Sequence, residues 1–215
     1  MKIMKSSIIA IIIFMGVFTF VMTSCAQNKS ANNAKYLEIG QLLFSNDKNE
    51  FVKFFNSFAT DKAKFISEYE ELLEDYDNFD FEKLTAIDVL YIFGDSKEQL
   101  LFIDWKGEEN EKEVESFIEK HLNRKVEWVN AAKFRKNSAI NEGDEDDENF
   151  VIRDFDLIID FFKEIDKDLQ QINQRLIFLS LDFDAYVLTT VDVKLFEQII
   201  TKMPNDFHGT DKLRK

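Results

Sequence analysis

Between residues 154 and 173, apolar side chains recur at the spacing of one helical face. The series consists of Ile158, Phe161, Phe162, Ile165, Leu169 and Ile172. A repeat of three to four residues is typical of an amphipathic helix, whereas a strand would alternate every second residue. The pattern predicts the longest amphipathic helix of the chain and makes helix packing the main constraint on the fold.

The same helical period recurs elsewhere from about Tyr36 onward. The spacing predicts helices over residues 51–58, 65–76, 80–93, 110–122 and 193–203. Asp80 and Asp192 are predicted N-caps, and Asn110 and Glu113 stand at capping-box spacing. Gly94 is predicted to end the helix that begins at Asp80.

Short runs rich in apolar and β-branched residues predict strands. Leu100–Trp105 indicates a buried strand, and Leu176–Leu181 and Tyr186–Val191 predict a hairpin joined by residues 182–185. Val126–Val129 predicts a further short strand. The expected fold is therefore α+β: amphipathic helices packed on a small sheet of about three to four strands, with a C-terminal β-hairpin and helix.

Domain organisation follows from these patterns and from charge. Residues 36–204 predict a single α+β domain, and residues 205–215 a polar tail. Residues 137–149 lack periodicity and contain the acidic run 142–148, which predicts a mobile solvated loop. The carboxylates of this run do not follow the alternating spacing of a calcium-binding loop.

The first 25 residues have the organisation of an export signal. Lys2 and Lys5 precede an apolar run from Ile8 to Met22, which ends close to Cys25, the single cysteine of the chain. A spanning helix needs about 20 apolar residues, so a plain membrane anchor is the weaker alternative. Residues 1–24 are predicted to be a signal peptide.

Met22-Thr23-Ser24-Cys25 resembles the lipobox of bacterial lipoproteins, with Met22 in place of the usual leucine. The resemblance implies cleavage before Cys25, lipidation of Cys25, and membrane attachment through the lipid. Residues 25–35 are small and polar and predict a lipidated tether. By resemblance to known sorting rules, Ala26 implies transfer to the outer membrane, and the absence of acidic residues at Gln27, Asn28 and Lys29 favours its periplasmic face.

The chain is acidic, which narrows the choice of partner. Its formal charge of −14 falls to −16 once residues 1–24, with two lysines and no acidic residue, are removed. Such a surface is repelled by phosphate, so nucleic acid is not expected as a partner. A basic protein is the favoured partner, although solubility alone would also explain the charge.

Several kinds of active site are excluded by composition. The six glycines do not form a phosphate-binding loop, and one cysteine with two distant histidines cannot form the familiar zinc sites. His121 and His208 stand in no catalytic motif, and His121 is expected to pack on its helix. No catalytic residue, cofactor or metal is expected, and the protein is predicted not to be an enzyme.

Three carboxylates form the candidate site. Asp104 ends a predicted strand, and Asp182 and Asp184 stand at the hairpin connection, so neighbouring strands could bring them to one sheet edge. They could then bind a ligand or a hard cation, but aspartates at such positions more commonly serve turns. Trp105 and Trp128 could flank a groove, although closing a core is the more common role of tryptophan.

Residues 80–203 resemble an uncharacterised bacterial domain family of unknown function. The resemblance rests on Phe102-Ile103-Asp104-Trp105-Lys106 and on the later run from Leu179 to Leu188. It implies no activity. The favoured hypothesis is a non-enzymatic, membrane-anchored lipoprotein that binds a protein partner; the alternatives are an immunity-type lipoprotein that neutralises a toxin and a carboxylate- or metal-dependent hydrolase of the envelope.

Overall fold

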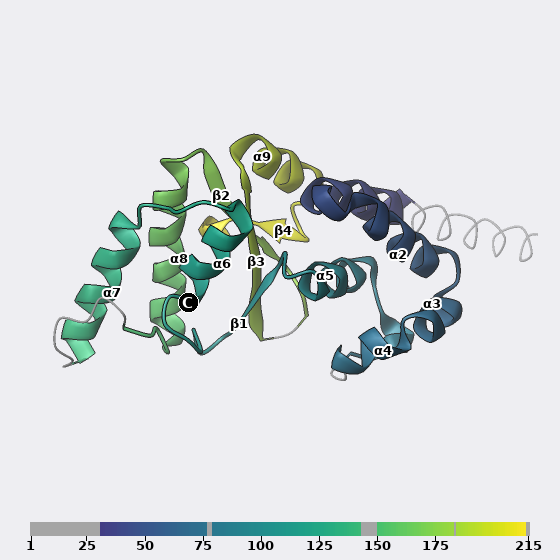
Figure 1. The fold of residues 1–215 in the computed structure, drawn as a ribbon, viewed down its shortest axis with the longest axis horizontal. Helices are drawn as coiled ribbons and strands as arrows, with labels where there is room; N and C mark the ends of the chain where they lie inside the picture. Colours follow the sequence, from purple (N-terminus) through teal and green to yellow (C-terminus); the bar gives the residue numbers. More distant parts are fainter. Residues whose placement is uncertain (1–30, 77–78, 143–149, 183, 214–215) are drawn as a thin grey trace, which may run out of the picture.

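The computed structural model describes residues 31–76, 79–142, 150–182 and 184–213. In this part of the chain a four-stranded antiparallel sheet lies between two groups of helices (Figure 1). The predicted α+β class and single domain architecture are confirmed. The predicted signal peptide, Cys25 and most of the acidic run 142–148 lie outside the described residues.

The sheet has the strand order β1-β3-β2-β4. Its strands are β1 (Leu101–Asp104), β2 (Gln174–Leu179), β3 (Ala185–Asp192) and β4 (Phe207–His208). The predicted hairpin is present, because β2 pairs with β3 from Gln174 opposite Asp192 to Leu179 opposite Val187. Strand β1 pairs with the other side of β3, and β4 with the other side of β2.

Alternate residues of the strands face two separate hydrophobic clusters. Ile177 and Val187 belong to the first cluster, and Phe178 and Leu188 to the second. Both faces of the sheet are covered, which explains why the β2 and β3 sequences are apolar almost throughout. The apolar runs therefore carry no clear two-residue alternation.

The first cluster is covered by helices from the N-terminal half and by the last helix. These are residues 31–43, η1 (Ser45–Asp47), α2 (Lys48–Thr60), α3 (Lys62–Glu68), α4 (Glu70–Leu73), η2 (Glu74–Tyr76), η3 (Phe81–Lys83), α5 (Ala86–Ser96) and α9 (Val193–Lys202). Phenylalanine rings pack edge to face here, for example Phe44 on Phe51 and Phe54 on Phe65. These phenylalanines therefore pack the core on this side of the sheet.

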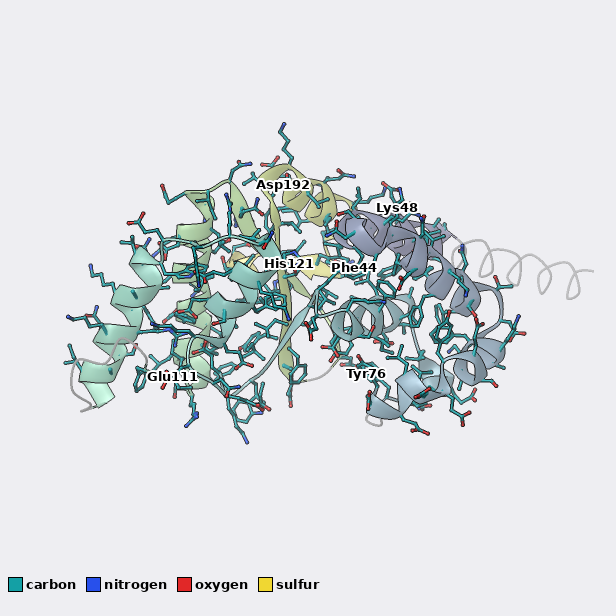
Figure 2. All side chains as sticks on the ribbon, in the orientation of Figure 1. Phe44, Lys48, Tyr76, Glu111, His121 and Asp192 are labelled. Atoms are coloured by element: carbon teal, nitrogen blue, oxygen red, sulfur yellow. The ribbon has the colours of Figure 1, made fainter. Side chains whose placement is uncertain are left out.

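The second cluster is covered by α6 (Glu113–Leu122), α7 (Val129–Glu142) and α8 (Phe155–Gln170). Helix α8 is the predicted amphipathic helix, and Asp154 caps it by accepting hydrogen bonds from the Asp156 and Leu157 amides. Figure 2 places Glu111 on this side of the sheet and Phe44 and Tyr76 on the other.

Two predictions for residues 126–149 are wrong. Val126–Val129 is not a strand, and residues 137–142 belong to α7 rather than to a loop. The physical reason is that α7 buries Ala131, Arg135, Ser138 and Ala139, which are small or polar. A helix with such a buried face carries no apolar period to detect.

The predicted helix over residues 80–93 is also corrected. Asp80 caps only η3, and α5 begins after Thr85, whose side chain forms a capping box with Asp88. Gly94 lies inside α5 instead of ending it. A Cβ atom at Gly94 would stand 2.6 Å from the Leu100 side chain, so this glycine allows close packing.

The remaining corrections concern broken helices and chain ends. The helix predicted over residues 65–76 is interrupted at Tyr69, and α6 begins after Lys112, which has a left-handed backbone. Residues 31–35 of the predicted tether are helical. The predicted polar tail instead supplies β4 and η4 (Thr210–Lys212), with Phe207 fully buried.

Within the described residues, no helix has the length and apolar character required to cross a membrane.

Candidate functional site

The structure places the three predicted aspartates around the same end of the hairpin without joining them in one site. Asp104 is paired with Ala185, so Asp184 lies one residue beyond the β1–β3 ladder. Asp182 lines a cavity to which neither Asp104 nor Asp184 contributes. The described residues contain no group of three or more His, Cys, Asp or Glu side chains arranged to hold a metal ion.

Asp104 serves the turn that follows β1. Its Oδ1 accepts a hydrogen bond of 2.8 Å from the Lys106 amide, and its carbonyl accepts one of 2.9 Å from the Gly107 amide. This is the turn chemistry that aspartate commonly supplies. Both contacts of Asp104 thus lie within the turn that follows β1.

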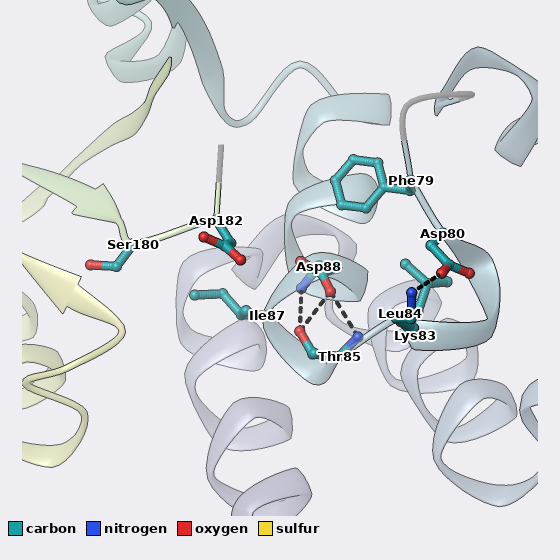
Figure 3. Close-up of a pocket in the computed structure, with 9 residues that line it drawn as sticks. All are labelled: Phe79, Asp80, Lys83, Leu84, Thr85, Ile87, Asp88, Ser180 and Asp182. Atoms are coloured by element: carbon teal, nitrogen blue, oxygen red, sulfur yellow. Dashed lines mark hydrogen bonds and ion pairs between the residues drawn. The ribbon is translucent and has the colours of Figure 1, made fainter. Parts of the chain in front are cut away.

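The cavity beside Asp182 has a volume of about 470 Å³ and lies between the hairpin connection and the start of α5. Figure 3 shows Ser180 and Asp182 on one side, and Asp80, Lys83, Thr85 and Asp88 on the other. Phe79, Leu84 and Ile87 supply its apolar lining. The cavity therefore combines carboxylates with an apolar surface.

Two of the three carboxylates in this cavity have local structural partners. Asp80 pairs with Lys83 at 2.6 Å, and this hydrogen bond holds the pKa of Asp80 below its usual range. Asp88 accepts hydrogen bonds from the Thr85 amide and hydroxyl at 2.7 and 2.6 Å. These contacts stabilise the turn and helix start, so they account for both side chains without a ligand.

Both histidines pack against phenylalanine rings. His121 stacks on Phe117 with ring centroids 5.9 Å apart, and His208 stacks on Phe178 at 5.5 Å. Burial lowers the pKa of His121, although a hydrogen bond with the Thr190 backbone opposes this effect. The predicted packing role of His121 is confirmed.

The two tryptophans have different environments. Trp128 is partly buried and donates its Nε1 hydrogen to Glu119 Oε1 at 3.1 Å. Trp105 is 44% exposed, and its ring centroid lies 6.2 Å from that of Phe155. Trp105 thus does not close a core.

The main polar cluster that the sequence did not predict is centred on Arg135. This side chain of α7 is fully buried, with Glu108 from the β1–α6 connection and Glu115 from α6 on either side. Nε and Nη2 donate to Glu115, Nη1 and Nη2 to Glu108, and Nη1 to the Phe150 carbonyl, at 2.6–2.8 Å. All five N–H donors of the guanidinium are used.

The electrostatics of this cluster favour a charged arginine. Burial alone would lower the pKa of Arg135, but the hydrogen bonds and charges of Glu108 and Glu115 outweigh it and raise the pKa. The guanidinium also lies 4.3 Å from the Phe161 ring centroid. Because the cluster is buried, its role is structural, and no sequence motif marked it.

Comparison with known protein families identifies the domain. Residues 35–203 match the family described as a domain of unknown function, DUF6630. The chain belongs to this family. The DUF6630 match confirms the prediction of an uncharacterised domain family. The matched region begins at residue 35 instead of residue 80, so it includes the N-terminal helices. Comparisons with curated proteins and with solved structures found no match.

Replacing Arg135 by methionine should destabilise the protein by about 3–5 kcal/mol, because Glu108 and Glu115 would remain buried without their cation. Urea unfolding at pH 7 measures this effect.

Two variants control this experiment. Lys133→Met removes an exposed cation from the same helix and should change stability by less than about 0.5 kcal/mol. Glu108→Gln and Glu115→Gln, added to Arg135→Met, should restore part of the lost stability. A loss for Arg135→Met equal to that for Lys133→Met would contradict the importance of the cluster.

Asp104→Ala should cost about 1 kcal/mol, because the Lys106 amide loses its side-chain partner. Asp184→Ala, at an exposed position, should cost less. Calcium or magnesium should leave the thermal unfolding midpoint unchanged for the wild type and for both variants. A rise of several degrees for the wild type that Asp104→Ala abolishes would instead reveal a cation site.

Proposed function

We propose that this DUF6630 protein is a lipid-anchored, non-enzymatic interaction protein of the bacterial envelope, attached through Cys25 and acting on a basic protein partner. The charged start, the apolar run and the cysteine at its end support the anchor. Attachment to the outer membrane is proposed from Ala26, and attachment at its periplasmic face from the absence of acidic residues at positions 27–29. These residues precede the described part of the chain.

The observation that carries the partner proposal is the excess of acidic side chains, 41 against 27 basic ones. In the described part of the chain, the buried acidic side chains are Glu108, Glu115, Asp166 and Asp168, and each is held by an arginine or by backbone amides. The other described acidic side chains are at least partly exposed. Most of the negative charge is therefore on the surface.

Burial lowers this excess only slightly, because four acidic side chains and one arginine of the described residues are removed from the surface. An acidic surface attracts basic proteins over about one Debye length and repels phosphate backbones. Nucleic acid therefore remains an unfavourable partner. A basic protein is the class of partner that the charge distribution favours.

No contact among the described residues specifically supports either of the two alternative hypotheses. The cavity beside Asp182 supports a hydrolase less than a structural interpretation, because Asp80 and Asp88 have partners within their own turn. An immunity-type lipoprotein would be a special case of binding a basic protein. It would be distinguished by the identity of the partner.

Lipidation predicts that the mature protein begins at Cys25 and partitions into membranes. Mass spectrometry of the N-terminal peptide should detect an acylated Cys25, and carbonate washing should leave the protein with the membrane fraction. The Cys25→Ser variant should keep residues 1–24 or appear in the soluble fraction. An unmodified N-terminus at another residue would contradict the anchor.

Partner binding predicts that the tagged full chain, cross-linked in envelope extracts, captures a protein with a net positive charge. Reconstitution of the purified pair should give an affinity that falls as salt rises, because screened charges attract more weakly. Titration calorimetry at low and high salt measures this dependence. An acidic partner, or a basic one whose affinity does not change with salt, would contradict the proposal.

A further inference from the structure

Strand β1 lies at one edge of the sheet. In the described part of the chain it pairs with β3 and has no strand on its other side. Such an edge offers backbone N–H and C=O groups to another strand, and proteins commonly protect it with lysine, proline or an inward charge. Strand β1 has only four residues and ends in Asp104, but its first three positions, Leu101-Phe102-Ile103, contain none of these.

A groove of about 590 Å³ follows this edge. Leu101 is opposite Leu188, which belongs to the cluster under α6–α8, whereas Phe102 is opposite Val187, which belongs to the other cluster. Leu101 and Phe102 thus approach the edge from opposite faces of the sheet, and both line the groove. Phe117 of α6 adds a further apolar wall.

Large apolar side chains are exposed at the same place. In the described residues, those with high exposure are Phe102, Trp105, Val129 and Ile140. Phe102 is 41% exposed in the middle of β1, and Trp105 follows the strand directly. Exposed aromatic rings beside an edge strand are a common feature of protein interaction surfaces.

The groove is acidic as well as apolar. Four carboxylates line it, from the end of α5, the loop after it, the β1–α6 connection and the first residue of α6: Asp95, Glu98, Glu111 and Glu113. Lys120 is the cation in the lining, and it pairs with Glu98. The formal charge of the lining is thus negative, which complements a segment with several lysines or arginines.

We propose that the outer edge of β1 binds an extended basic segment of a partner protein, which adds to the sheet as a further strand. Backbone hydrogen bonds to β1 provide the pairing. Apolar side chains of the segment pack beside Phe102, and alternate basic side chains face the carboxylates. This inference rests on the proposed function and names its docking surface.

A second copy of this chain is a poorer occupant of the edge. Antiparallel pairing of two β1 strands would bring two sets of the same carboxylates together, and like charges across an interface are unfavourable. The net charge of −14 on each chain adds to this repulsion. Charge therefore selects a basic segment over self-association.

The test uses the full chain in detergent micelles and a synthetic acetylated peptide, Lys-Val-Lys-Val-Lys-Val-Lys amide, as the probe. Peptide binding should slow hydrogen exchange of β1 amides at least tenfold. Phe102→Lys, which places a charge on the edge as natural edge strands do, should weaken binding at least tenfold. Ile140→Lys makes the same charge change at a 52% exposed side chain of α7 and should bind like the wild type.

A second peptide with the same lysines and with proline in place of each valine keeps the charge but cannot pair as a strand. It should bind at least tenfold more weakly and leave β1 exchange unchanged. Equal binding of both peptides, or equal effects of Phe102→Lys and Ile140→Lys, would overturn the proposal. So would dimers, detected by light scattering, that protect the β1 amides without peptide.

The same variants separate this inference from the proposed function. If the basic partner captured from envelope extracts binds Phe102→Lys as well as it binds Ile140→Lys, the proposed function holds and the β1 surface is wrong. If no basic partner is captured, the proposed function fails, whatever the peptide does. If Phe102→Lys loses the captured partner and Ile140→Lys keeps it, the result supports both the proposed function and the β1 surface.

Discussion

The second half of the fold depends on one buried guanidinium. Arg135 connects α7, α6, the β1–α6 connection and the segment before α8 through hydrogen bonds of 2.6–2.8 Å. Glu108 in turn accepts the Val114 amide at the start of α6 and the Ile152 amide. Four separate segments are therefore positioned by a single set of charged groups.

This cluster also fixes how the chain leaves β1. The Glu108 amide donates to the Ile152 carbonyl at 2.7 Å, next to Gly107, whose φ of +116° favours glycine. A Cβ atom at Gly107 would stand 2.0 Å from the Ile152 oxygen. The turn after β1 therefore packs tightly against Ile152. As a result, α6 starts beside the edge of β1, and the acidic residues at its start line the groove.

Much of the fold could be predicted because apolar spacing records which face of an element is buried. Helix α8 and the β2–β3 hairpin were predicted close to their observed bounds for this reason. Helix α7 was not, because its buried face carries Arg135 and small residues, and because its start is capped from a distance by Asp168 of α8. Neither signal is local in the sequence. The candidate aspartates were likewise predicted at strand ends. The placing of Asp104 in a turn and of Asp182 at a separate cavity depends on the register of the strands, which the sequence pattern does not give.

In the proposed function, surface charge and the geometry of the β1 edge would provide different parts of binding specificity. Surface charge acts over about 8 Å at physiological salt, so it can concentrate any basic protein near the domain without distinguishing between them. The edge of β1 would act only at hydrogen-bonding distance and would accept only a segment that can extend beside Phe102. The acidic residues of the groove would act at both distances, because they contribute to the overall field and would also contact the docked segment. Selection of a partner by this domain would thus depend on its backbone conformation as much as on its charge.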